Sequence, residues 1–537
     1  MSTPSDAQHE AGWQIKAREK REAINSEIPS HWQIAHVPDA DELKDAQHYA
    51  QMADARALLE KLAGGQYTAL EVTEAFCHRA AIAHQTVNCL SEIIFDQALE
   101  RAKELDAYFK ANKKPIGPLH GLLISLKDQF RVKNTHTSVG FVAWLDRKET
   151  DETESYLVKV LHDAGAIVYI KTNVPTSLMA IETNNHITGY TWNPRNRHLS
   201  SGGSSGGEAA LIAMKGSILG LGTDIVYGLK PSHGRLPYLG VRQSMEGHDS
   251  APSVVGPLAS TVSNLKLLTD IILQSQPWLH DPKVVELPWR PTEFDEVHSR
   301  AKSQGLSFGM LKFDGVVMPH VPVLRAMDEL KAKLQAAGHE VIEWTPPPHS
   351  EAFHILWDVF TMDGGNDVHD TLAISGETPV AQLAASYSQS KGSLPAFDIP
   401  KIWNLHQRKY DYQTRYSQYW NSTANLTKSH RPVDAVLLPA APSASFRPGE
   451  GVYFSYTGVA NVLDYSVVTV PVTTVDKTKD LKDGNDERTS DLDKLVGSHY
   501  DPEMFDGTPV GIQIMARRLQ EERVVAIADV IDDLLRV

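Results

Sequence analysis

At residues 200–208 the sequence reads Ser-Ser-Gly-Gly-Ser-Ser-Gly-Gly-Glu, four serines and four glycines in one short loop. An apolar, helix-forming run at 209–214 follows directly. Glycines at this density let the backbone bend sharply and approach a bound group. Serine hydroxyls, with N–H groups at a helix N-terminus, suit a developing negative charge. Flexible linkers often have this composition, but a linker would not run straight into an apolar helix. We therefore interpret the loop as part of a catalytic site.

The composition is that of a large globular protein. At 537 residues the chain exceeds the usual domain size, so either two domains or one large α/β body is expected. Hydrophobic residues make up 42% and charged residues 22%, which is ordinary for a globular chain. The net charge of −15 argues against nucleic acid or an anionic membrane as a partner. No apolar run approaches the length that spans a bilayer.

Cysteine and histidine usage indicates neither disulfides nor metals. Cys77 and Cys89 lie in helical-looking sequence and make neither a disulfide framework nor a zinc knuckle. Residues 1–21 are polar and show no secretory signal, so we expect a cytoplasmic protein. The 23 histidines are scattered, without His-Glu-x-x-His or paired His/Cys spacing. We therefore expect no metal and no cofactor.

Strands and helices alternate along most of the chain. Residues 1–60 read as a charged helical N-terminal arm, and 61–537 as the main domain. We expect helical sequence at 66–113 and 347–430, and an exposed charged loop at 477–493. The predicted strands are 122–126, 167–171, 307–311, 341–344, 433–438 and 467–470, with helices at 154–164 and 321–337. This alternation predicts an α/β fold, a single large body with a twisted mixed sheet flanked by helices.

Lys127 is the first candidate for chemistry. It ends the apolar run 122–126. Desolvation there would lower its pKa from about 10.4 and let it act as a base near neutrality. A lone lysine at a strand end is, however, more often a surface residue, so Lys127 alone does not indicate a catalytic site.

Three familiar loop types fail to explain residues 200–208. No Gly-Lys-Ser/Thr closes the loop, which excludes a phosphate-binding loop. The Gly-x-Gly at 220–222 lacks the third glycine of a dinucleotide fingerprint. The Gly-x-Ser-x-Gly at 202–206 has the spacing of an α/β-hydrolase elbow, but polar residues 196–200 stand where the elbow needs an apolar strand.

Seven segments occur in a characteristic order along the chain, at 121–128, 171–175, 202–208, 222–225, 228–231, 252–258 and 509–514. Together they resemble the motifs of the amidase signature family, within its fungal acetamidase-like branch. Any one motif is weak, but the ordered set is highly specific and covers the chain from about residue 60 to its end.

The resemblance implies a Ser–cis-Ser–Lys triad that hydrolyses amides. Lys127 matches the family's base, and Ser204 matches the serine that follows a cis peptide bond, here with Gly203. Ser204 would pass a proton between the nucleophile and Lys127, while Ser205 would support the loop by hydrogen bonding. Ile225 matches the first of the backbone N–H donors of the oxyanion hole.

One expected segment is missing. The family continues after Gly-Thr-Asp-Ile with Gly-Gly-Ser-Ile-Arg and a further short stretch, whereas here Val226 and Tyr227 lead straight to 228–231. By this comparison on the order of a dozen residues are absent, roughly three turns if helical. The acylated serine and most oxyanion donors go with them, and Asp224 loses the arginine expected nearby. Four serines remain close in sequence, none at the nucleophile position: Ser200, Ser201, Ser205 and Ser232.

Three hypotheses follow for this polypeptide. It is an amidase by family whose nucleophile segment is missing, for example through a wrongly predicted reading frame. Alternatively, it is an inactive relative that binds small amides or carboxylates, or a chain that no longer folds properly. The expected partner is a small amide such as acetamide, and the resemblance leaves both a homodimer and a monomer open. Trp357, Phe360 and 363–365 are candidates for pocket lining, with core packing as the alternative.

Overall fold

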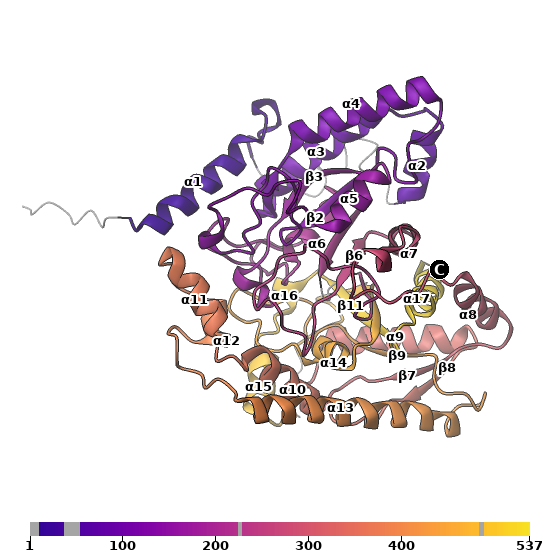
Figure 1. Ribbon diagram of the computed structural model, residues 1–537. Coiled ribbons are helices and arrows are strands. Elements are labelled where there is room, and N and C mark those ends of the chain that lie inside the picture. The colour runs from indigo at the N-terminus through magenta and orange to yellow at the C-terminus, as the bar shows by residue number, and fades with distance from the viewer. Residues whose placement is uncertain (1–9, 37–53, 224–227, 483–487, 537) are drawn as a thin grey trace, which may run out of the picture.

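The computed structural model describes residues 10–36, 54–223, 228–482 and 488–536 (Figure 1). Its strands form two mixed sheets. The first has the order β1-β3-β2-β4-β6, and β2 runs parallel to both of its neighbours while the edge strands β1 and β6 are antiparallel. Its members are β1 (Leu90–Ile93), β2 (Leu123–Lys127), β3 (Ile167–Thr172), β4 (Leu219–Thr223) and β6 (Val255–Ala259).

The second sheet has the order β5-β10-β11-β9-β7-β8. β7 runs parallel to β8 and β9, while β10 pairs antiparallel with β5 and β11. Its members are β5 (Leu229–Lys230), β7 (Ser307–Met310), β8 (Glu340–Glu343), β9 (Ala435–Pro439), β10 (Ser466–Thr474) and β11 (Pro509–Ala516).

The two sheets meet along their edge strands β5 and β6. A Cβ on Gly256 of β6 would collide with the carbonyl oxygen of Leu229 on β5, so glycine is required for this approach. Ala259 and Trp289 pack against the apolar cores of both sheets. The α/β class is confirmed, with the strands divided between two abutting sheets where the sequence predicted one. The domain division at residue 60 stays a prediction.

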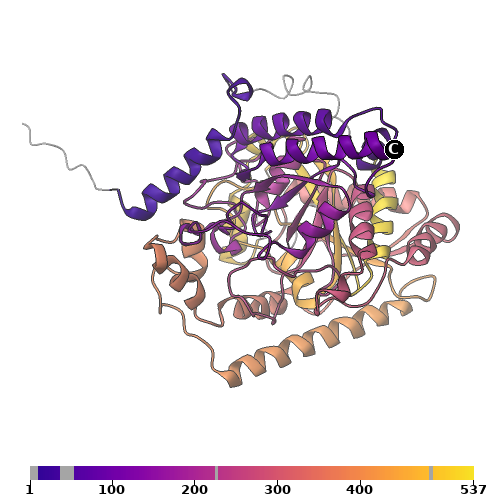
Figure 2. The same cartoon turned by 45° about the horizontal axis from the view of Figure 1, so that its top comes forward.

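Helices cover both sheets (Figures 1 and 2). Over the first lie α2 (Ala55–Ala63), α3 (Ala69–Val87), α4 (Phe95–Asn112), α5 (Tyr156–Asp163), α6 (Gly206–Ala213) and α7 (Val262–Gln274), with η1 (Ser30–Trp32), η4 (Val142–Trp144), η5 (Thr176–Leu178) and η6 (Pro277–Leu279) nearby. The later helices are α8 (Pro291–Ser303), α9 (Val321–Ala336), α10 (His349–Thr361), α11 (Asn366–Ser375), α12 (Ala381–Tyr387), α13 (Ile399–Ser422), α14 (Ser455–Leu463), α15 (Asp491–Ser498), α16 (Pro502–Phe505) and α17 (Glu521–Arg536), with η7 (Thr423–Asn425).

The apolar strand β9 is covered by helices on both faces of the second sheet. On β9, Leu437 packs into the core formed with α9 and α17. Its neighbours Val436 and Leu438 pack into the core formed with α10, α13 and α14. Successive side chains of a strand point to opposite faces, so an uninterrupted apolar run suits a strand buried on both sides.

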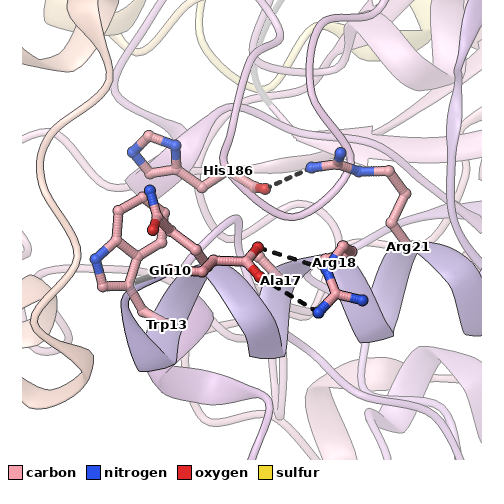
Figure 3. A pocket seen from close by; sticks show the side chains of 7 residues that line it. Glu10, Trp13, Ala17, Arg18, Arg21 and His186 are labelled. Carbon is pink, nitrogen blue, oxygen red and sulfur yellow. Dashed lines mark hydrogen bonds and ion pairs between the residues drawn. The ribbon is translucent and has the colours of Figure 1, made fainter. Parts of the chain in front are cut away.

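The N-terminal arm is anchored through α1 (Gly12–Ser26). Figure 3 shows the pocket between α1 and the loop that bears His186. Arg21 donates to the carbonyl oxygens of His186 at 2.9 Å and Ile187 at 2.8 Å. Arg18 pairs with Glu10 at 3.3 Å in the same view. Arg21 thus attaches the helix to the body, whereas Arg18 pairs within the N-terminal arm.

Most predicted elements are present within a few residues of their expected bounds, and two predictions are wrong. β1 interrupts the stretch 66–113, where only helix was expected. The charged segment 477–493 is not wholly exposed, because Asp480 is buried and pairs with Arg325 at 2.7 Å. Residues 483–487 of that segment lie outside the described residues. Among the helices of the described ranges, none is long and apolar enough to cross a membrane.

Candidate active site

The serine- and glycine-rich loop leads into α6 beside the carboxyl ends of the inner strands β2 and β4 of the first sheet. The peptide bond between Gly203 and Ser204 is cis. A Cβ on Gly203 would lie 2.8 Å from the carbonyl oxygen of Ala180 and the nitrogen of Glu182, so the loop packs directly on that backbone. This close approach explains the glycine before Ser204.

Lys127 lies at the carboxyl end of β2 and is fully buried. Its Nζ donates to Ser204 Oγ at 2.7 Å and to Thr223 Oγ1, at the end of β4, also at 2.7 Å. Thr223 Oγ1 in turn donates to Gln129 Oε1 at 2.6 Å. Because β2 and β4 are parallel neighbours, their carboxyl ends bring Lys127 and Thr223 together beside the loop. The two residues named as candidates, Lys127 and Ser204, are therefore in direct contact.

Ser205 fixes the loop to the same strand end. Its Oγ donates to the backbone oxygen of Thr223 at 3.1 Å. Gly206, the next residue, opens α6. Ser205 thus has the supporting contact expected of it. Asp224 and Ile225 lie outside the described residues.

Glu208, in the first turn of α6, lies beneath this group. It is fully buried and accepts hydrogen bonds from the hydroxyls of Ser125 on β2 and Thr172 on β3, the latter at 2.8 Å. Burial raises the pKa of Glu208 from 4.5 to about 7, against the opposing effect of these hydroxyls and of Lys127. One carboxyl group therefore joins α6 to two strands below the site.

A cavity of about 510 Å³ opens on Ser204. Gly203 and Thr223 also line it, so Ser204 faces the cavity while Lys127 lies behind it. Trp357 and Phe360 of α10 line it as expected. Residues 363–365 do not line it and instead form the turn before α11, where Gly365 N donates to Asp363 Oδ1 at 2.8 Å. The volume lies in the range of roughly 300–1,000 Å³ typical of small-molecule sites.

We next compared the sequence with those of known protein families. A family model described as Amidase matches residues 71–525. The chain belongs to the amidase family.

Individual relatives agree with this assignment. The chain is 41% identical to the acetamidase of Emericella nidulans, with 97% of this chain and 98% of that protein covered. It is 40% identical to the acetamidase of Aspergillus oryzae, over 98% and 99% of the two chains. Among solved structures, a fatty acid amide hydrolase superposes with a TM-score of 0.88 at 30% identity, covering 98% of this chain and 95% of that one.

None of the four serines noted beside the gap lines the cavity of this family member. Ser201 Oγ donates to Thr191 O at 3.1 Å, and Ser200 Oγ accepts from Gly202 N at 3.0 Å. Ser205 is engaged at β4, as described above. Ser232 lies by the second sheet, within 3.0 Å of Ser466 Oγ. Their contacts are those of structural hydroxyls.

The sequence reasoning missed Thr223, Gln129 and Glu208. A threonine at the end of a glycine-rich strand and a glutamine two residues after Lys127 carry no signal of their own. Glu208 carried one, because it is the single charged residue between the loop and an apolar helix. A carboxylate at the start of an apolar helix is buried together with that helix. A buried carboxylate needs hydrogen-bond partners inside the protein.

Proposed function

We propose that this chain carries an amide-hydrolysing site of the Ser–cis-Ser–Lys type, acting on small carboxylic acid amides such as acetamide to give carboxylate and ammonia. The observation that carries the proposal is the 2.7 Å hydrogen bond from the buried Lys127 Nζ to Ser204 Oγ at the cavity wall. The acetamidases of similar sequence support the choice of small amides as first substrates.

The proposed mechanism is a proton relay. In its neutral form Lys127 accepts a proton from Ser204, which takes one from the hydroxyl of the attacking nucleophile. The nucleophile forms a tetrahedral intermediate with the amide carbon, and the relay returns the proton to the departing nitrogen. The C–N bond breaks and leaves an acyl ester on the nucleophile. Water, deprotonated through the same relay, attacks this ester, and the relay returns the proton to the nucleophile oxygen as the carboxylate leaves. Thr223, bonded to both Lys127 and Gln129, holds the amine toward Ser204.

We further propose that the nucleophile segment is missing after Ile225. The sequence passes from Gly-Thr-Asp-Ile to Gly-Leu-Lys-Pro through two residues only. The match to the Emericella nidulans acetamidase spans 545 positions, more than the 537 residues of this chain, so the relative has residues that this chain lacks. Loss of a single oxyanion donor costs roughly a hundred- to a thousandfold in rate. The chain as written should therefore hydrolyse amides weakly or not at all.

The test is restoration. Inserting Gly-Gly-Ser-Ile-Arg and the rest of the family segment after Ile225 should give ammonia release from acetamide. In the restored chain Lys127→Ala should abolish it, whereas Lys103→Ala, an exposed lysine on α4, should leave it unchanged. A restored, folded chain without activity on any small amide would overturn the proposal.

A second candidate is an inactive relative that binds small amides or carboxylates in the retained cavity. The observation in its favour is that Ser204 and the cavity are present while none of the four serines beside the gap reaches it. The transcript separates these readings. An in-frame continuation that encodes Gly-Gly-Ser after Ile225 would identify an error of the gene model, and its absence would favour the binding protein.

A further inference from the structure

Ser204 is the accessible hydroxyl-bearing residue next to the buried lysine of the site. It lines the cavity of about 510 Å³ and is half-buried. Lys127 behind it is fully buried, and Ser205 beside it is 3% exposed and does not line the cavity. A molecule in the cavity therefore meets Ser204 before it meets Lys127.

The hydroxyl of Ser204 is also uncommitted to the rest of the loop. Within the described ranges, its one recorded hydrogen bond is the one from Lys127 Nζ at 2.7 Å. By contrast, Ser201 Oγ donates to Thr191 O and Ser205 Oγ donates to Thr223 O. When Lys127 is neutral, the bond to Ser204 reverses, and the hydroxyl donates its proton to the amine.

Gln129 fixes the direction of the hydrogen bonds on the other side of Lys127. Its Nε2 donates to the backbone oxygen of Arg242 at 3.0 Å and to Tyr238 OH at 3.1 Å. A backbone oxygen can only accept, so the amide nitrogen is held at this end. The amide oxygen then lies at the other end, where Thr223 Oγ1 donates to it at 2.6 Å. Because Thr223 gives its single proton to Gln129, its oxygen accepts from Lys127.

This direction leaves the base ready to act on Ser204. A neutral lysine amine has one lone pair, and Thr223 has no proton left to give to it. The lone pair is therefore available to the hydroxyl of Ser204. An activated serine needs a hydroxyl, a base within hydrogen-bond reach and a group that orients the base. Ser204, Lys127 and Thr223 supply these three parts, and serine–lysine pairs are one of the known forms of such a site.

We propose that in the chain as written Ser204 is itself a nucleophile, which Lys127 deprotonates and which takes the acyl group of activated aryl esters. The inference goes beyond the proposed function, in which Ser204 only passes a proton to and from another nucleophile. It rests on the proposed function for one point, the role of Lys127 as the base.

The reaction forms one carbon–oxygen bond and breaks another. Neutral Lys127 takes the proton of Ser204 as the serine oxygen attacks the carbonyl carbon of p-nitrophenyl acetate. The tetrahedral intermediate collapses, the bond from carbon to the aryl oxygen breaks, and p-nitrophenolate leaves as an anion. The products are acetyl-Ser204, the ammonium of Lys127 and p-nitrophenolate. After the ammonium has lost its proton to solvent, Lys127 deprotonates a water that attacks the acetyl ester, and the proton returns to Ser204 as acetate leaves.

The leaving group decides which substrates react at Ser204. An amide nitrogen must be protonated before it leaves, and its tetrahedral intermediate depends on oxyanion donors. By the proposed function, most of these donors are absent with the missing segment, so acetamide is not a substrate of Ser204. An aryl oxide leaves without a proton and depends less on those donors. Trp357 and Phe360 line the cavity and offer apolar surface to the aryl ring.

The probe is p-nitrophenyl acetate, added to the unmodified chain. Stopped-flow absorbance should show a burst of about one equivalent of p-nitrophenolate per chain and then slow turnover. Turnover is slower than the burst because the serine oxygen of acetyl-Ser204 is a poorer leaving group than p-nitrophenolate. Peptide mass spectrometry of the quenched protein should find acetyl on Ser204, in a form that hydroxylamine removes as it removes an ester. Acetyl on other residues only, including a stable amide on Lys127, overturns the inference.

Three variants test the roles of the residues. Ser204→Ala should abolish the burst, and Lys127→Met should slow it by a factor on the order of 10²–10⁴, the usual contribution of a general base. Ser201→Ala, on the same loop and bonded to Thr191 O, should leave the burst unchanged. A full burst in Ser204→Ala or in Lys127→Met overturns the inference. The site of acetylation in the unmodified chain decides the question even where a variant fails to fold.

The outcomes distinguish this inference from the proposed function. Acetyl-Ser204 in the unmodified chain, without amide hydrolysis by the restored chain, would support the inference and contradict the proposed amidase chemistry. Amide hydrolysis by the restored chain, without acetyl-Ser204 in the unmodified chain, would leave the proposed function standing and overturn the inference.

Discussion

Two fully buried lysines, Lys127 and Lys171, lie on adjacent parallel strands and have different surroundings. Lys171, on β3, lies 3.6 Å from Asp128 Oδ1 and donates to His136 O at 2.6 Å and Thr137 Oγ1 at 3.0 Å. Lys127, on β2, donates to Ser204 and Thr223, and Ser204 faces the cavity.

The partners of a buried lysine decide whether it serves the structure or can transfer a proton. Burial lowers the pKa of Lys171, and the Asp128 carboxylate opposes that shift and holds the ammonium in place. The ammonium of Lys171 serves to satisfy a carboxylate and two oxygens inside the protein. A lysine bonded to a hydroxyl that faces a cavity can instead exchange a proton with that hydroxyl.

The largest expected effect separates the two lysines by activity. In the chain with the restored segment, Lys127→Met should lower amide hydrolysis by a factor on the order of 10⁴ or more, since a relay member acts as part of a unit. The melting temperature should change far less than the rate. Ammonia release and thermal unfolding of the same preparation check this, and a rate within tenfold of the restored parent would break the comparison.

The next effect is on stability, at the other lysine. Lys171→Met leaves Asp128 buried without its cation, which should cost about 3 kcal/mol of unfolding free energy. Asp128 keeps its bonds from Ser91 Oγ at 2.9 Å and Val139 N at 2.7 Å, which limits the loss. Urea denaturation measures the change. Adding Asp128→Asn should recover part of it, and a double variant less stable than Lys171→Met would contradict the ion-pair role.

Glu208 gives a pH-dependent prediction. Its folded-state pKa of about 7 lies above its ordinary value of 4.5, so the folded state favours the protonated carboxyl. This stabilisation is complete below pH 4.5 and is lost as the pH rises through 7, by up to roughly 3 kcal/mol. Glu208→Gln should therefore flatten the fall in melting temperature between pH 5 and 8. Parallel pH curves for the two proteins would show that Glu208 is not the titrating group.

The smallest effect belongs to Ser205. Ser205→Ala removes one hydrogen bond to Thr223 O and should cost about 1 kcal/mol of stability. In the restored chain it should slow hydrolysis only modestly, because Ser205 holds the loop and transfers no proton. Ser201→Ala is the matched control on the same loop, with its bond to Thr191 O outside the relay. A loss of rate as large as that of Lys127→Met would place Ser205 in the relay itself.

Local patterns of apolar residues predict much of the fold. Apolar, β-branched runs such as those of β9 and β10 are buried on both faces and were recognised as strands. The sequence did not predict β1, because its residues Ser91 and Glu92 are polar although they are buried. Glu92 forms an ion pair with Lys20 at 2.6 Å. That pairing joins segments far apart in the sequence and leaves no trace in the local periodicity.

In the active site too, local motifs predict some residues, while others depend on contacts between segments far apart in the sequence. Motif resemblance named Lys127 and Ser204, and the structure places them in contact. Thr223 and Gln129 acquire their role from the strand ends that the fold brings beside Lys127, which no spacing along the chain encodes. The stretch 363–365 shows the converse, since its aspartate and glycines form a helix-initiating turn that sequence alone does not distinguish from a pocket wall.

Ammonia release from acetamide by the unmodified chain, measured beside the chain restored after Ile225, tests both the relay and the missing nucleophile segment. The unmodified chain should give only background release of ammonia, and the restored chain should turn acetamide over. Turnover at an ordinary enzymatic rate by the unmodified chain, abolished by replacing one surviving serine with alanine, would contradict this prediction.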